Sequence, residues 1–291
     1  MICLPVKRPS LSRTGGMNDL LLNGHDPVLM GIVNVTPDSF SDGGRHFLSD
    51  LAIAHGKRLI GEGAHILDIG GESTRPGAEP VSVEDELRRV LPVIGGLKDC
   101  GAVISIDTRN AETMRQAIAA GARMVNDVTA LTHAGGGAVD LVANAGVYVC
   151  LMHMKGDPQS MQDDPHYDDV FTEVYEYLLS RIGACRARGI QMGRIIADVG
   201  IGFGKTVDHN LILLNRMKEF ESLGVSLMLG ASRKRFIASV SGGSEPAQRD
   251  AGSIAAAIAA WQRGVKIFRV HDVAATKQAL DVYRAITGIC G

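Results

Sequence analysis

The stretch VLMGIVN, residues 28–34, is an apolar run that stops on a polar side chain, Asn34. Seven further apolar runs along the chain also lead into Asp, Asn, His, Ser or Arg. They are Ala64–Leu67 before Asp68, Ala102–Ile106 before Asp107, Ala122–Val125 before Asn126, Val147–Met152 before His153, Arg194–Ala197 before Asp198, Val225–Leu229 leading to Ser232, and Val265–Phe268 before Arg269. A parallel strand buried on both faces reads as a continuous apolar run. The pattern therefore predicts eight parallel strands.

Segments with helical periodicity separate these runs, near residues 48–62, 82–98, 110–120, 136–145, 168–188, 208–223, 249–263 and 273–287. Ser82 begins a capping-box-like arrangement, and Asn110 and Asp208 are suited to the N-cap position. Parallel strands need long crossover connections, which helices usually supply. Eight strand–helix units predict an α/β fold of the (β/α)8 TIM-barrel type, since open doubly wound sheets usually have fewer strands.

The length of 291 residues suits one such barrel, and 45% apolar residues are enough to fill its core. No linker rich in Pro, Gly or Ser divides the chain, so we expect a single domain. Residues 1–16 lack the apolar core of a signal peptide, and Met17 could begin the ordered part. We therefore expect residues 1–17 to form a flexible N-terminal tail and residues 18–291 to form the barrel.

Composition argues against several classes of protein. Lys and Arg (30) nearly balance Asp and Glu (32), and no basic stripe stands out, so nucleic-acid binding is not expected. No apolar stretch approaches the length of a membrane span, so no membrane partner is expected either. The scattered cysteines contain no C-x-x-C pair and predict reduced thiols in a cytoplasmic protein. They are Cys3, Cys100, Cys150, Cys185 and Cys290.

Polar residues at the carboxyl ends of barrel strands indicate an active site, because these ends meet at one mouth. The longest stretches without periodicity, residues 34–47, 70–81 and 153–167, follow the first, second and fifth expected strands. Long loops on the catalytic side of a barrel can close over a substrate. The sequence therefore predicts an enzyme with candidate lids around the mouth.

These strand ends and loops carry a set of motifs that resembles the dihydropteroate synthase family. The motifs are MGIVNVTPDSFSDGG (30–44), DIGGESTRPG (68–77), ISIDTR (104–109), Asn126–Asp127, LMHMKG (151–156), DVGIGFGK (198–205), GASRK (230–234) and RVHD (269–272). The resemblance runs from about Val28 to Val282 in the family's order and spacing. It implies a transferase that joins 6-hydroxymethyl-7,8-dihydropterin pyrophosphate to p-aminobenzoate, releasing pyrophosphate and giving the folate precursor 7,8-dihydropteroate.

The resemblance also implies which side chains hold the pterin ring. Asp198 resembles the carboxylate that accepts from the ring N3–H and the 2-amino group. Asn126 resembles the amide that meets N1 and the 2-amino group, and Asp107 the carboxylate near the other ring nitrogens. Lys234 would donate to O4 and N5, and Met152 is a further expected contact. Lys234, Arg269, His271 and Asp38 are the expected catalytic residues.

The leaving diphosphate is expected at Asn34, Arg269 and His271, with Asn34 as the contact for a Mg2+ cofactor. The carbon–oxygen bond to the diphosphate would break early, and the aniline nitrogen of p-aminobenzoate would then attack, without a covalent enzyme intermediate. The resemblance places the second substrate among loop residues and implies inhibition by sulfonamides. Those residues are Thr36, Pro37, Asp38, Ser39 and Phe40, closing with Thr74, Arg75 and Pro76 against Phe203 and Lys234.

Several residues keep a purely structural alternative. Asp107 and Asp198 could cap the following helix, and Asn126–Asp127 could share a turn. His271 could be a half-buried residue that closes the mouth. For His153, lining of the site and structural hydrogen bonding remain equally open.

The chain departs from the family pattern at two positions, Val199 in place of Pro and Arg235 in place of Ser. The second departure leaves open whether Arg235 or a backbone N–H meets the carboxylate of p-aminobenzoate. The glycine run 200–206 fits neither the Walker A nor the dinucleotide-binding spacing.

Two alternative functions remain: a pterin-binding methyltransferase with a corrinoid partner, and a paralogue that binds pterin without turnover. The diphosphate residues count against the first, and no expected catalytic side chain is missing as the second would require. Family members commonly form homodimers through later helices. The apolar helix at 251–261 could form that interface or face the core.

Overall fold

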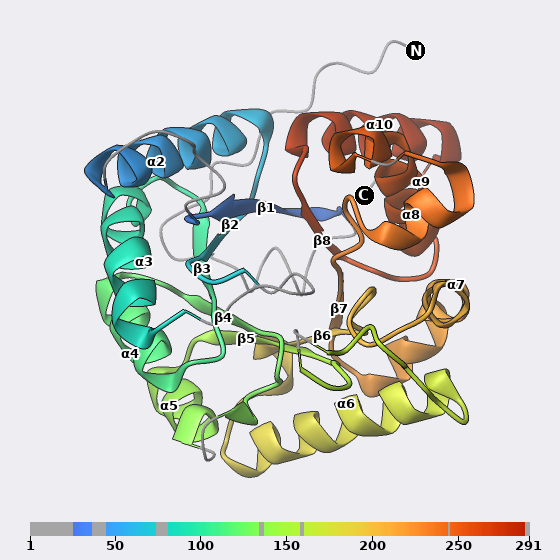
Figure 1. The fold of residues 1–291 in the computed structure, drawn as a ribbon, viewed down its shortest axis with the longest axis horizontal. Helices are drawn as coiled ribbons and strands as arrows, with labels where there is room; N and C mark the ends of the chain where they lie inside the picture. Colours follow the sequence, from blue (N-terminus) through green and yellow to red (C-terminus); the bar gives the residue numbers. More distant parts are fainter. Residues whose placement is uncertain are drawn as a thin grey trace.

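The computed structural model describes residues 26–36, 45–73, 81–133, 137–157, 160–243 and 245–288, with side chains omitted at 45–47. Eight parallel strands form one closed barrel in chain order, as the sequence predicts. They are β1 (Val28–Asn34), β2 (Ile66–Gly70), β3 (Val103–Asp107), β4 (Met124–Asp127), β5 (Tyr148–Met152), β6 (Ile195–Asp198), β7 (Ser226–Leu229) and β8 (Ile267–Val270). Figure 1 looks into this ring of strands.

Helices surround the barrel and alternate with the strands (Figure 1). The α-helices are α2 (Arg45–Glu62), α3 (Val83–Leu97), α4 (Ala111–Ala120), α5 (Gly137–Ala145), α6 (Val170–Ala187), α7 (Val207–Asn215), α8 (Arg235–Ser241), α9 (Asp250–Trp261) and α10 (Val273–Thr287). Short 3-10 helices are η3 (Met192–Arg194), η4 (Met217–Leu223) and η5 (Pro246–Arg249). The (β/α)8 TIM-barrel prediction is confirmed.

The core inside the barrel is separate from the core outside it because alternate strand residues face opposite sides. A third, small cluster comprises Val128, Met152, Met161 and Phe203. Inside the barrel, apolar side chains fill the end away from the polar strand termini; they are Val28, Met30, Ile66, Met124, Cys150, Ile196, Met228 and Ile267. The larger part lies between strands and helices. Gly31 lets α2 lie close to β1, since a Cβ there would come within 2.9 Å of the Leu59 Cδ1 atom.

The strand boundaries explain how polar residues enter the site. Asn34, Asp107, Asp127 and Asp198 are the last residues of their strands. Asp68 instead lies in the middle of β2, which begins later than the run Ala64–Leu67 predicts. The apolar-run criterion placed the end of this strand too early, because an inward-facing position near the mouth can carry a polar side chain.

Three N-cap residues were predicted. Ser82 is confirmed, Asn110 has the predicted position but not the capping bond, and Asp208 is wrong. Ser82 caps α3 by accepting from the Asp85 N–H at 3.1 Å. Asn110 occupies the N-cap of α4, but its side-chain nitrogen donates to Glu86 Oε2 at 2.9 Å instead of capping. The N-cap of α7 is Thr206 and not Asp208.

The helix predicted at 208–223 is broken into α7 and η4, and α8 was not predicted. A long-range contact lies at this break. Arg263 Nε donates to the Asn215 carbonyl at 3.0 Å, and the Glu219 N–H turns to the carbonyl of Arg216 at 3.0 Å. That last bond has the tighter 3-10 spacing.

The predicted tail, residues 1–17, lies outside the described residues. Within the described ranges, no helix has both the length and the apolar character needed to cross a bilayer. Cys100, Cys150 and Cys185 are free thiols.

Candidate active site

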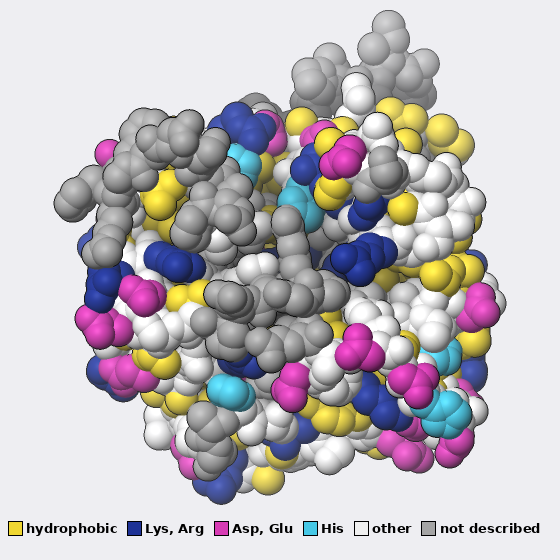
Figure 2. All heavy atoms as spheres, in the orientation of Figure 1, with side chains coloured by type: hydrophobic (Ala, Val, Ile, Leu, Met, Phe, Trp, Pro, Cys, Tyr) yellow, Lys and Arg dark blue, Asp and Glu magenta, His cyan; other side chains and the backbone are white. Residues whose placement is uncertain are grey.

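A cavity of about 730 Å³ opens at the carboxyl ends of the strands. Ten residues predicted for the site line it: Asn34, Thr36, Asp107, Asn126, Met152, Asp198, Phe203, Lys234, Arg269 and His271. In Figure 2, which keeps the orientation of Figure 1, Lys and Arg side chains flank the middle of the face. The predicted residues Pro37, Asp38, Ser39, Phe40, Thr74, Arg75 and Pro76 lie outside the described residues.

Arg269 lies between two carboxylates at the bottom of this cavity. Its Nε donates to Asp68 Oδ2 at 2.6 Å, and its Nη2 donates to Asp107 Oδ2 at 2.7 Å. Asn126 Nδ2 donates to the same Asp68 oxygen at 3.0 Å. Burial lowers the pKa of Arg269 and the two carboxylates raise it, with a net upward direction. The guanidinium therefore stays charged and joins three strands.

Asp68 is a site-forming residue that sequence reasoning missed. It is fully buried, and its Oδ1 atom accepts no hydrogen bond from any described residue. Asp68 pairs in register with Ile32 of β1 and with Ser105 of β3, so its side chain shares the barrel interior with them. An acidic residue within an otherwise apolar run was the available signal, because such a buried charge needs a cation.

The cavity carboxylates Asp107 and Asp198 have raised pKa values for the same reason. Burial raises the pKa of Asp107 to about 7, and the charge of Arg269 opposes that rise. Burial also raises the pKa of Asp198, opposed by the Gly200 N–H, which donates to Asp198 Oδ1 at 2.8 Å, and by Lys234. The cavity therefore holds carboxylates whose protonation depends on neighbouring positive charge.

Gly200 is required where the loop after β6 passes the end of β5. Its φ is +70°, and a Cβ there would lie only 1.9 Å from the His153 carbonyl oxygen. The same loop carries Phe203, whose ring centroid lies 3.9 Å from Lys234 Nζ. The glycine run thus forms one wall of the cavity, with an aromatic ring against a cation.

Lys205, at the end of this run, is a second residue that sequence reasoning missed. It is 2% exposed and lines the cavity, and its Nζ lies 2.9 Å from His153 Nδ1 and 3.0 Å from the Phe203 carbonyl oxygen. Burial lowers the pKa of Lys205 to about 7 and that of His153 to about 3. His153 is buried and bonded to Lys205, which favours its structural interpretation.

The neighbours Asn126 and Asp127 have different roles, one at the cavity and one in a turn. Asp127 accepts from the Thr129 and Leu131 N–H groups at 2.7 and 2.8 Å and so holds the turn after β4. Asn126 faces the cavity instead. The turn interpretation is therefore correct only for Asp127.

The loop 153–167, described except for residues 158 and 159, supplies part of the cavity wall. Met161 and Gln162 line the cavity, and Gln162 Nε2 donates to the Gly202 carbonyl at 2.6 Å. Neither residue was singled out from the sequence, because no motif marks them. Their contact with the glycine run joins two of the strand-end loops.

His271 follows β8 and is bonded to the loop after β7. The Ser232 hydroxyl lies 3.0 Å from His271 Nδ1 and accepts from the His271 backbone N–H at 3.3 Å. If the hydroxyl donates to Nδ1, the proton of the neutral ring is on Nε2. Ser232 was named in the sequence only as a strand end; the structure adds its contact with His271.

Asn34 is compatible with Mg2+. Among the described residues, no group of three or more His, Cys, Asp or Glu side chains could hold a metal ion. Mg2+ commonly keeps several waters and binds through one or two protein oxygens together with substrate phosphates. The half-buried amide of Asn34, at the cavity wall, fits that limited role.

Comparison with known proteins identifies the family of this site. Residues 30–271 match the family described as pterin binding enzyme. The dihydropteroate synthase of Escherichia coli (strain K12) is 45% identical over 260 residues, which cover 89% of this chain and 91% of that protein. The chain belongs to the dihydropteroate synthase family of pterin-binding enzymes. Its activity is that of a dihydropteroate synthase, a transferase of folate biosynthesis.

Solved structures of dihydropteroate synthases share the fold. Xanthomonas albilineans dihydropteroate synthase with 4-aminobenzoic acid is 52% identical, with a TM-score of 0.85 over 91% of this chain and 94% of that one. The same enzyme in complex with 7,8-dihydropteroate gives 48% identity and a TM-score of 0.82 over 91% and 95%. These similarities favour a synthase over the corrinoid methyltransferase and the binding-only alternatives.

The two departures from the family pattern fall in different environments. Val199 is fully buried next to Asp198, which remains the last residue of β6. Arg235 begins α8, is exposed and lines the outer part of the synthase cavity. The first departure therefore leaves Asp198 at the cavity.

Proposed function

We propose that this synthase binds the pterin ring against Asp107, Asn126 and Asp198, with Met152 as an apolar contact. The observation that carries the proposal is the meeting of these side chains with Arg269 in one cavity at the strand ends. A pterin offers the donors N3–H and 2-amino on one edge, which suit a carboxylate. Asp198 Oδ1 is held by the Gly200 N–H, so its second oxygen supplies an acceptor for this edge.

The proposed diphosphate end comprises Arg269, His271 and Asn34. Arg269 is balanced by Asp68 and Asp107, and its side chain remains 21% exposed toward the cavity. With Nδ1 bonded to Ser232, His271 can offer its Nε2–H to a phosphate oxygen. Mg2+, held by Asn34 and the diphosphate oxygens, would supply further positive charge.

The proposed reaction breaks the carbon–oxygen bond first, and its electron pair leaves with the diphosphate. Arg269 and His271 stabilise the growing negative charge by preorganised hydrogen bonding. Lys234 donates to the pterin O4 and N5 and orients the ring. The aniline nitrogen of p-aminobenzoate then forms the new carbon–nitrogen bond and loses a proton. Asp38, from the loop after β1, completes the proposed catalytic set.

The second substrate is proposed to lie between Phe203 and Lys234 on one side and two loops on the other. The 3.9 Å contact between these two side chains supports the described wall. The loops contribute Thr36, Pro37, Ser39, Phe40, Thr74, Arg75 and Pro76. Sulfonamides, which resemble p-aminobenzoate, are proposed to bind the same space.

The proposed partners are these two small molecules and a second copy of the chain, without nucleic acid or membrane. Exposed apolar residues on α7, α8 and α10 support a homodimer through the later helices; they are Leu211, Ile212, Val240, Val282 and Ile286. The proposed location is cytoplasmic, which the free thiols support.

The test is product formation from 6-hydroxymethyl-7,8-dihydropterin pyrophosphate and p-aminobenzoate, with and without Mg2+. We expect Mg2+-dependent dihydropteroate with an equal amount of pyrophosphate. Tight binding of the pterin pyrophosphate without product would instead support a binding-only protein. Absence of both binding and product would contradict the proposed site.

A further inference from the structure

Arg233, between Ser232 and Lys234, has a backbone conformation that L-residues avoid. Its φ is +60°, a value in the left-handed region that only Ala130 and Leu131 share among the described non-glycine residues. In this region the Cβ atom crowds the following carbonyl oxygen. Such a conformation persists where the surrounding structure imposes it, and it is often found at functional sites.

The side chain of Arg233 is held by the first residue of α9. Arg233 Nε lies 2.7 Å from Asp250 Oδ1, and Nη2 lies 2.9 Å from Asp250 Oδ2. Two parallel bonds between a guanidinium and a carboxylate fix orientation as well as distance. The two side chains are 28% and 29% exposed, so water screens this pair less than a surface pair.

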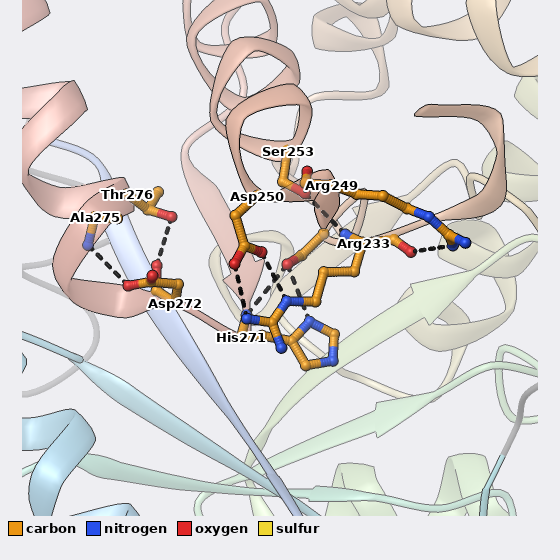
Figure 3. Close-up of polar contacts among 9 residues, drawn as sticks. Arg233, Arg249, Asp250, Ser253, His271, Asp272, Ala275 and Thr276 are labelled. Atoms are coloured by element: carbon orange, nitrogen blue, oxygen red, sulfur yellow. Dashed lines mark hydrogen bonds and ion pairs between the residues drawn. The ribbon is translucent and has the colours of Figure 1, made fainter. Parts of the chain in front are cut away.

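The backbone of Arg233 is held by the same part of the chain (Figure 3). Its N–H donates to Ser253 Oγ at 2.9 Å, and its carbonyl accepts from Arg249 Nη1 at 3.1 Å. Ser253 Oγ donates onward to the Arg249 carbonyl at 2.7 Å. Thus η5 and the first turn of α9 bind the guanidinium, the N–H and the carbonyl of one residue.

Arg233 lines the cavity together with its two neighbours, and each neighbour makes a further contact at the site. Ser232 is bonded to His271 Nδ1, and Lys234 lies over the ring of Phe203. A change in the φ of Arg233 would alter the directions of both neighbours together. The conformation at one residue therefore sets two separate parts of the cavity wall.

We infer that Arg233 is a positioning residue, which Asp250 and Ser253 hold so that Lys234 faces the pterin ring and Ser232 orients His271. The inference rests on the proposed roles of Lys234 and His271. The guanidinium of Arg233 acts through these neighbours, because Asp250 engages it. Breaking the Arg233–Asp250 pair weakens binding of the ring and of the diphosphate together.

The experiment uses the full chain with Asp250→Ala and measures the Kd values of 6-hydroxymethylpterin and of inorganic pyrophosphate separately by calorimetry. We expect both Kd values to rise about tenfold, with a fall in kcat. Asp250→Glu keeps a carboxylate and should recover most of the affinity. The double variant Arg233→Ala with Asp250→Ala should have Kd values no higher than those of the single variant that binds more weakly, because the two residues act as one unit.

Asp140→Ala is the matched control, since Asp140 forms an exposed ion pair with Arg188 far along the chain from these loops. It should leave both Kd values unchanged. Asp250→Asn keeps the size of the side chain and should give a smaller rise in both Kd values. It replaces Asp250→Ala as the test variant if Asp250→Ala does not fold.

Folded Asp250 variants that bind both probes like the wild type would overturn the inference, even with a lower unfolding temperature. Additive effects of the two single substitutions would overturn it as well. A wild-type enzyme that binds neither probe would overturn the proposed roles of Lys234 and His271, and the inference with them. The first two results leave those roles intact, so the failures are distinguishable.

Discussion

The cavity has two walls that are built in different ways. The strand wall consists of Asp107, Asn126, Asp198 and Arg269, which all lie within β-strands. The buried Asp68 of β2 accepts from Asn126 and Arg269 of this wall. The loop wall consists of the segments 200–205 and 232–234 with His271. Strand register positions the first wall, whereas side-chain bonds to neighbouring loops and helices position the second. A barrel can thus hold one substrate edge rigidly and adjust the other through loop contacts.

The largest effect is expected from Arg269→Ala in the strand wall. The change removes the cation between Asp68 and Asp107 and a ligand of the leaving diphosphate. We expect kcat/KM to fall by about 1,000-fold, in the upper range for loss of a preorganised transition-state donor. Arg188→Ala, which removes an exposed ion pair, is the control for steady-state kinetics. A fall of less than tenfold would exclude Arg269 from the chemistry.

Gly200→Ala tests the loop wall at its closest approach to β5. A Cβ would lie 1.9 Å from the His153 carbonyl, in a backbone conformation with φ of +70°. We expect the free energy of unfolding to fall by about 2–5 kcal/mol, from strain and overpacking together. Gly189→Ala has similar strain at φ of +86° but no neighbour within 4 Å, and it should cost about 1–2 kcal/mol. Urea denaturation measures the free energy of unfolding of both variants. An equal loss in Gly200→Ala and Gly189→Ala would show that crowding at the His153 carbonyl is unimportant.

Asp198→Asn tests pterin recognition in the strand wall. The amide keeps an oxygen for the Gly200 N–H but turns an N–H toward the donor edge of the pterin. We expect the Kd of 6-hydroxymethylpterin to rise by about 10–100-fold with little change in the unfolding temperature. Calorimetry on this variant and on Asp140→Asn provides the comparison. Unchanged affinity would place the ring elsewhere.

Lys205→Met tests how burial changes the protonation of the loop wall, and its effect is confined to the pH dependence of stability. Because burial lowers the pKa of Lys205 to about 7 in the folded protein, the folded state binds fewer protons than the unfolded state from about pH 7 to 10.5. Lys205 therefore makes the free energy of unfolding rise with pH across that window, by at most about 1.4 kcal/mol per pH unit. We expect Lys205→Met to remove this rise, and exposed Lys218→Met to retain it. The same pH slope in both variants would contradict the prediction.

Sequence reasoning predicted the strand wall better than the loop wall. Asp107, Asn126 and Asp198 were found because each ends an apolar run, which is a local signal. Asp68 was missed as a site residue because the run Ala64–Leu67 places the strand end too early. In the loop wall, Ser232 and Lys205 were not assigned to the site. Their contacts with His271 and His153 join residues 39 and 52 positions apart, and no local pattern encodes them.

The helices show the same division between local and long-range causes. Ser82 was predicted as a cap because its partner, Asp85, is three residues away. The break between α7 and η4 was not predicted, and the contact found there joins Asn215 to Arg263, 48 residues away. The roles of Asp38 and of the other predicted loop residues outside the described ranges remain predictions from the sequence.

The sequence by itself determined the eight-fold alternation of strands and helices, the polar strand ends and the family of the enzyme. These properties depend on periodicity and on short motifs, which can be read within a few residues. Only the tertiary structure decided that Arg269 meets Asp68, 201 residues away, and that α9 holds Arg233 beside Lys234. Such contacts follow from barrel closure and helix docking, which bring distant segments together and depend on the whole chain.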